Sequence, residues 1–101
     1  MPLYISLTNL TEQGRKTIKG RPERIRDVNK EITSMGGKIV AQYATLGPYD
    51  FVTVIEAESN EAVLSISVEL GARGTVSIIT LPAIEVDRFI SRAWAPPSPR
   101  R

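Results

Sequence analysis

Tyr49 and Asp50 are the clearest candidates for chemistry in this chain of 101 residues. They follow the Gly47-Pro48 pair, at the point where a strand is predicted to begin. A carboxylate beside a phenol can bind a small ligand, with the carboxylate accepting a proton and the phenol donating a hydrogen bond. The alternative is structural, because an aspartate at a turn often accepts backbone N–H groups while the aromatic ring packs at a sheet edge. Tyr43 and Tyr4 are further candidate ligand-binding residues, or else packing residues of their strands.

The composition excludes most familiar catalytic and metal sites. The chain contains no cysteine and no histidine, which rules out disulfides, thiolate or imidazole metal sites, and triads with an imidazole base. An enzyme of this sequence would have to use carboxylates, arginine, lysine or tyrosine. We interpret Glu56, Glu58 and Glu61 as a solvated acidic patch, with a hard-cation site as the alternative. We expect no resident metal and no cofactor.

The charges are nearly balanced, with 13 lysines and arginines against 11 acidic residues. Basic residues concentrate between positions 12 and 38, but acidic residues are interspersed among them, which is typical of a solvated helix face. No apolar run approaches the ~20 residues of a membrane span, and the N-terminus carries no visible targeting signal. We therefore expect a cytoplasmic protein that binds neither membranes nor nucleic acid.

The order of predicted elements indicates an α+β, ferredoxin-like βαββαβ fold with a four-stranded antiparallel sheet. Strands are predicted over residues 3–10, 38–46, 50–57 and 75–84, and helices over 11–18, 21–35 and 59–71. The segment 59–71 also alternates as a strand would, but Ser59 can cap a helix and Gly71 can end one, which favours the helix. Pro22 suits the first turn of the second helix.

The length predicts one domain, which we place over residues 1–94. Its end is a short amphipathic helix over about residues 86–94, because Val86, Phe89, Ile90 and Trp94 recur at helical spacing. Residues 95–101 form a tail rich in proline and arginine.

Apolar side chains occupy both faces of the predicted strands. Val52 and Val54 share one face of the third strand, and simple alternation puts Ile39, Ala41 and Tyr43 on one face of the second. Two helices can cover only one face of a sheet, so we expect a second copy of the chain to cover the other, giving a homodimer or a larger ring. The alternative is that the terminal helix folds back over this face. The candidate interface residues are Val52, Val54, Phe89 and Trp94.

The segment Leu46–Val52, following Met35–Val40, resembles the GYD-domain family, which is named for Gly-Tyr-Asp at the hairpin. The opening segment Leu7–Gly14 and the pair Glu56-Ala57 are also similar, so the resemblance covers roughly residues 3–85. A proline interrupts the signature, giving Gly-Pro-Tyr-Asp at residues 47–50. The family belongs to the dimeric α/β-barrel superfamily, so the resemblance implies a ferredoxin-like fold and self-association.

The same superfamily includes cofactor-free oxygenases, haem-degrading enzymes and isomerases, many of which use a histidine that this chain lacks. We expect a homo-oligomeric module that binds a small ligand or regulates, in preference to an enzyme. One alternative is a cofactor-independent enzyme, of the oxygenase or isomerase kind, using Asp50 and Tyr49. Another is an RNA-binding module, although Asp50 and Val54 replace the small residue and the aromatic of the RNA-binding octapeptide.

Overall fold

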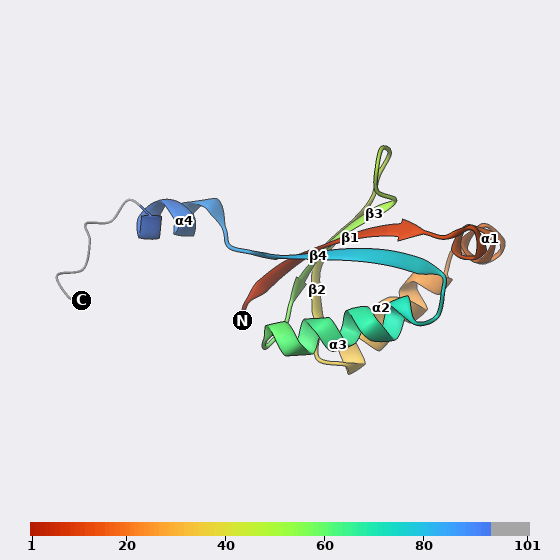
Figure 1. Ribbon diagram of the computed structural model, residues 1–101, viewed down its shortest axis with the longest axis horizontal. Helices are drawn as coiled ribbons and strands as arrows, with labels where there is room; N and C mark the ends of the chain where they lie inside the picture. Colours follow the sequence, from red (N-terminus) through yellow and green to blue (C-terminus); the bar gives the residue numbers. More distant parts are fainter. Residues whose placement is uncertain (94–101) are drawn as a thin grey trace.

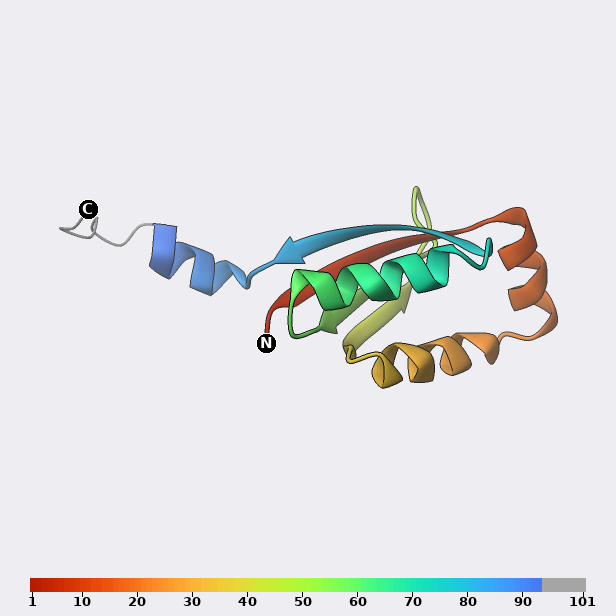
Figure 2. The same cartoon turned by 60° about the horizontal axis from the view of Figure 1, so that its bottom comes forward.

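The computed structural model of the chain describes residues 1–93, and its elements follow the predicted order. They are β1 (Leu3–Leu10), α1 (Glu12–Gly20), α2 (Arg24–Ser34), β2 (Lys38–Ala44), β3 (Phe51–Glu56), α3 (Asn60–Gly71), β4 (Val76–Ala83) and α4 (Val86–Ala93). The strands form one antiparallel sheet in the order β2-β3-β1-β4. Helices α2 and α3 lie across one face of it, and α1 lies at one end (Figure 2). The predicted ferredoxin-like fold is confirmed.

Helices α1 and α3 begin at capping side chains. The Thr11 side chain accepts the Gly14 N–H at the start of α1, and Ser59 accepts the Ala62 N–H at the start of α3. The helical interpretation of residues 59–71 is therefore confirmed. Gly36, with φ of 96°, supplies the left-handed conformation that follows α2. Pro22 lies in the turn before α2, not inside its first turn as predicted, since α2 begins at Arg24.

The register of the sheet assigns each strand residue to one of two faces. Ile5 is opposite both Val54 and Leu81, and Leu7 is opposite both Val52 and Ile79. These side chains point away from the helices and form the open face. Its members are Ile5, Leu7, Ala41, Tyr43, Val52, Val54, Ile79 and Leu81. The open face is thus apolar across all four strands.

A β-bulge in β2 changes the face on which one predicted residue lies. The register shifts between Ile39, which is opposite Ile55, and Ala41, which is opposite Val54. Ile39 therefore points towards the helices and packs beside Ile32, whereas Ala41 lies on the open face. Simple alternation is wrong for Ile39, because a bulge adds one residue to its strand and moves every side chain beyond it to the other face.

Helix α4 lies apart from the sheet, continuing from the end of β4 (Figure 1). Its apolar residues Val86, Phe89 and Ile90 are 70%, 49% and 48% exposed. The alternative that this helix folds back over the open face is therefore wrong, since no reversing turn separates it from β4. Docking of Phe89 on a neighbouring molecule stays a prediction. Trp94 and the predicted tail 95–101 lie outside the described residues.

The start of α1 is held tightly against the loop between α3 and β4. The Thr11 N–H donates to the Thr75 carbonyl at 3.0 Å, and the Thr11 hydroxyl donates to the Gly74 carbonyl at 2.8 Å. Gly14 is buried beneath this contact, where a Cβ would overlap the carbonyl oxygen of Thr75. Only a residue without a side chain lets the helix approach so closely.

The close approach of α1 to Thr75 predicts that alanine substitution at two glycines of this helix has very different effects on stability. Gly14→Ala should lower the free energy of unfolding by about 1–3 kcal/mol, because either α1 or the Thr75 backbone must move. Gly20→Ala, where a Cβ meets open space, should leave stability unchanged or raise it slightly. Urea unfolding of both variants measures the difference, and equal stabilities would contradict the account.

Candidate functional site

Asp50 comes directly before β3 and continues the pairing of that strand with β1. Its own N–H donates to the Thr8 carbonyl at 2.9 Å, and its carboxylate accepts the Leu10 N–H at 2.8 Å. The next strand position would normally supply a carbonyl for Leu10, but β3 begins only at Phe51. The carboxylate takes the place of that carbonyl. The geometry therefore matches the structural alternative for Asp50.

The three candidate tyrosines lie in different surroundings. Tyr4 is 2% exposed beneath the helices, and its hydroxyl donates to Asn60 Oδ1 at 2.6 Å. Tyr43 is 61% exposed on the open face. Tyr49 is half-buried in the hairpin turn, where its carbonyl accepts the Thr45 hydroxyl at 2.6 Å. Tyr4 and Tyr43 point to opposite faces of the sheet, so they do not belong to one site.

A cavity lies between the sheet and the helices. This cavity has a volume of about 330 Å³. Its apolar walls come from α1, α2, α3 and the sheet, and include Ile18, Val28, Ile66, Leu70 and Ile78. None of the four candidate site residues, Tyr4, Tyr43, Tyr49 and Asp50, lines it. Sequence reasoning missed this cavity.

One row of polar side chains crosses the sheet on the cavity side. Thr53 is opposite both Gln42 and Ser6, and Ser6 is opposite Thr80, so each strand contributes one residue. All four line the cavity. Asn29 on α2 exchanges hydrogen bonds with Gln42 at 2.8 and 3.2 Å. In the sequence, Ser6 and Thr8 alternate with Ile5 and Leu7, which indicates one polar and one apolar face of this strand. The pattern alone does not tell which of the two faces the helices.

An ion-pair cluster joins α2 to the end of α3 beside the cavity. Glu31 Oε1 lies 2.7 Å from Arg73 Nη1 and 4.0 Å from Arg24 Nη2. The hydrogen bond from Arg73, assisted by the charges of both guanidinium groups, lowers the pKa of the Glu31 carboxyl. The same pairing raises the pKa of Arg73. The two arginines are the only ionisable residues that line the cavity within the described part of the chain.

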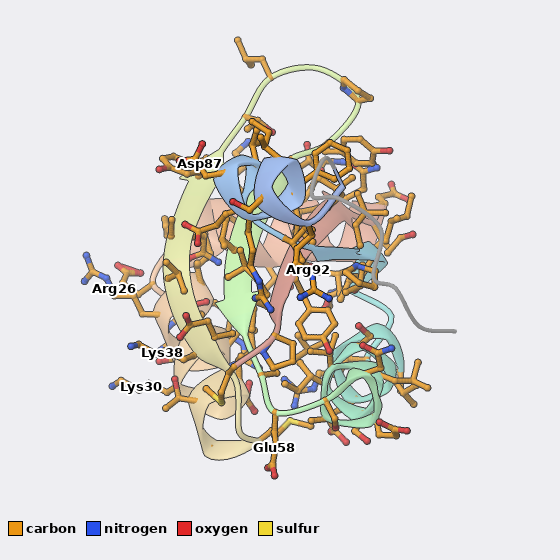
Figure 3. The ribbon with its side chains drawn as sticks, turned by 90° about the vertical axis from the view of Figure 1, so that its left-hand side faces the viewer. Arg26, Lys30, Lys38, Glu58, Asp87 and Arg92 are labelled. Atoms are coloured by element: carbon orange, nitrogen blue, oxygen red, sulfur yellow. The ribbon has the colours of Figure 1, made fainter. Side chains whose placement is uncertain are left out.

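Other charged groups do not assemble into a site. Arg26, Lys30 and Lys38 project outwards along one side of the molecule, away from the cavity (Figure 3). Among residues 1–93, no three carboxylates come together as metal ligands would. Over the same residues, no helix combines the length and apolar character needed to cross a bilayer.

The position of Asp50 predicts graded effects of two substitutions. Asp50→Ala should lower the free energy of unfolding by about 1–2 kcal/mol, because the Leu10 N–H loses its acceptor. Asp50→Asn should lose less, since the amide oxygen can still accept. Urea unfolding measures both, and an Asp50→Asn variant more stable than the unaltered protein would indicate a functional carboxylate instead.

The Glu31 pair predicts a specific pH dependence. A carboxyl whose folded pKa lies below its ordinary value of 4.5 stabilises the fold above that pH, and the stabilisation is lost as the pH falls through the folded pKa. Glu31→Gln should therefore melt slightly below the unaltered protein at neutral pH, and the difference should vanish in acid. Thermal melts across the pH range test this, with the exposed Glu58→Gln as a control. A difference that persists in acid would contradict it.

Comparison with known proteins identifies the family. The model of the GYD domain matches residues 4–93. A relative from Thermus thermophilus, named glutamine synthetase and cystathionine beta-lyase binding protein, is 47% identical over 93 residues, which are 91% of this chain and 98% of that protein.

Two solved structures share the fold. A Thermus thermophilus protein has a TM-score of 0.54 at 18% identity, over 84% of this chain and 95% of its own. The 5-chloro-2-hydroxyhydroquinone dehydrochlorinase of Burkholderia phenoliruptrix, solved with 2,5-dihydroxybenzoquinone, has a TM-score of 0.63 at 14% identity, over 85% and 97%. Likeness at such identities shows the fold alone, whereas the match over residues 4–93 shows the family: the chain belongs to the GYD-domain family.

Proposed function

We propose that this chain is a homo-oligomeric regulatory module that binds other proteins and a small molecule. The observation that carries the proposal is the open face, which is apolar from one edge of the sheet to the other. Ile79 and Leu81 on this face are 49% and 45% exposed. A contiguous apolar patch of this extent marks an interaction surface, whereas scattered apolar side chains are normal on a monomer.

The first occupant of the open face is a second copy of the chain. An apolar sheet packs best against another apolar sheet, at a separation of about 10 Å. The residues Lys38 and Glu56, whose charged groups lie 3.9 Å apart, form a polar margin at one end of the patch. A polar rim around an apolar centre is the usual anatomy of a protein interface.

Helix α4 supplies a second surface, one suited to a different protein. Phe89 and Ile90 are exposed on one side of it, while Asp87 and Arg92 carry charge. Such helices bind by laying an apolar side into a groove of the partner. The name of the Thermus thermophilus relative supports metabolic enzymes as partners, with glutamine synthetase and cystathionine beta-lyase as the two to test first.

The enzymatic alternative receives less support from the geometry. The Asp50 carboxylate accepts the Leu10 N–H, and it lines neither the cavity under the helices nor the hollow beside Pro2 and Asn60. A regulatory role requires only interaction surfaces and a ligand site, and the open face, α4 and the cavity support such a role.

Self-association predicts a clear effect of charge on the open face. Val54→Lys should turn the oligomer into a monomer or an aggregate, because an ammonium group cannot be buried unpaired between two sheets. Val68→Lys is the matched control, since Val68 is 63% exposed on α3. Light scattering coupled to size exclusion measures the mass. An unaltered protein that is monomeric at micromolar concentration would refute the proposal.

Partner binding predicts a separate effect at α4. The double change Phe89→Ala and Ile90→Ala should weaken binding to purified glutamine synthetase or cystathionine beta-lyase from the same host by roughly tenfold or more, since it removes two apolar anchors. Leu64→Ala, at another exposed helix position, should have no effect. Biolayer interferometry measures both. Failure of the unaltered protein to bind either enzyme would remove these enzymes as partners.

A further inference from the structure

One row of the covered face carries polar side chains, and the open face on the other side of the sheet is apolar. An antiparallel sheet with one covered face normally buries its apolar side chains and exposes its polar ones. Here the middle row of the covered face is Gln42, Thr53, Ser6 and Thr80, while the flanking rows of the open face are apolar. Polar groups buried in this way lower stability unless they are hydrogen-bonded, so the partners of each one matter.

The hydrogen bonds along this row leave donor or acceptor positions of its central hydroxyl groups unused. At one end, Gln42 donates to Thr53 at 3.2 Å and also pairs with Asn29. At the other end, the Thr80 hydroxyl lies 3.1 Å from that of Ser67 on α3.

Ser6 lies between these two groups and is 7% exposed, and its nearest polar side-chain partner is the Thr8 hydroxyl at the limiting distance of 3.5 Å. A hydroxyl offers one donor and two acceptor positions. Ser6 and Thr53, which is 4% exposed, can therefore each make another hydrogen bond into the cavity.

The charges around the cavity select against an ionic ligand. Arg24 and Arg73 are its only ionisable lining residues within the described chain, and both are paired with Glu31. Arg24 also lies 3.8 Å from Asp27, and Arg73 lies 3.4 Å from Glu69. No unpaired charge remains there to balance a buried carboxylate or ammonium, which would carry a large desolvation cost.

We propose that the cavity binds a neutral organic molecule with an apolar body and hydroxyl or carbonyl groups along one edge. The apolar body packs against the isoleucine and valine walls of the helices, and its polar edge bonds to Ser6 and Thr53. The volume of about 330 Å³ lies at the lower end of the range for small-molecule sites, so the ligand is compact. This inference rests on the proposed binding function, but it requires neither self-association nor a protein partner.

Three fluorescent probes that share one ring system test the ligand class: 2-naphthol, naphthalene and 2-naphthoate. Fluorescence anisotropy at neutral pH should give saturable binding of 2-naphthol, roughly three- to tenfold tighter than naphthalene because of one added hydrogen bond. The anionic 2-naphthoate should bind most weakly. Equal affinities for all three probes would overturn the proposed ligand class. No saturable binding of 2-naphthol would overturn the site, the cavity then holding water only.

Matched variants test the site. Ser6→Ala or Thr53→Val, whichever removes the partner of the naphthol hydroxyl, should reduce 2-naphthol affinity to about that of naphthalene. Neither change should alter naphthalene binding. Ser65→Ala, on the exposed side of α3, is the control and should change neither. Melting temperatures show that each variant is folded. Unchanged 2-naphthol affinity in both cavity variants would overturn the assignment.

One further variant separates this proposal from self-association. Val54→Lys lies on the other side of the sheet and should retain full 2-naphthol affinity even where it abolishes the oligomer. NMR shifts induced by 2-naphthol should centre on residues 6, 8 and 53. Shifts centred on the open face would overturn the cavity site, and they would leave the case for self-association as it stands.

Discussion

The register of β1 against its two neighbours is the constraint on which the rest of this protein depends. β1 lies inside the sheet and pairs with both β3 and β4. Its alternation places Tyr4 and Ser6 beneath the helices and Ile5 and Leu7 on the open face. A slip of one residue would exchange the two sets, burying the apolar row, exposing the polar one and removing both the cavity lining and the apolar patch. The tight contact of Gly14 with Thr75 and the Asp50–Leu10 hydrogen bond hold the two flanking strands at that register.

This arrangement divides the apolar surface of the chain between the inside and the outside. The buried core consists of two small clusters, one around Tyr4 and Val63 and the other around Ile32, Ile66 and Leu70. Much of the remaining apolar surface lies on the open face and on α4. Under the proposed self-association, part of the stabilising burial comes from the partner, so the stability of the fold and its assembly are linked and both depend on protein concentration.

The two proposed binding surfaces share one sheet. Successive residues of the same strand serve the cavity and the open face in turn, as Thr53 and Val54 do on β3. Under both proposals, a ligand that bonds to Thr53 would act on a strand whose opposite side would contact the second subunit. Such a short path gives a regulatory module a physical route from a small molecule to its assembly, because packed strands shift together and do not deform one residue at a time.

The sequence by itself determined the order of the elements, the Ser59 cap at the start of α3, the ferredoxin-like fold and the apolar character of Val52 and Val54. These features follow from local periodicity, from capping chemistry and from apolar residues on both faces of a strand. All of these can be read from the sequence of one chain. The tertiary structure alone decided which face of each strand the helices cover, where the bulge moves Ile39, and that Tyr4 and Tyr43 lie apart. It also decided that Ser6, Gln42, Thr53 and Thr80 meet in one row. Pairing between distant strands sets these positions, and the alternation within a strand is the same whichever face is buried.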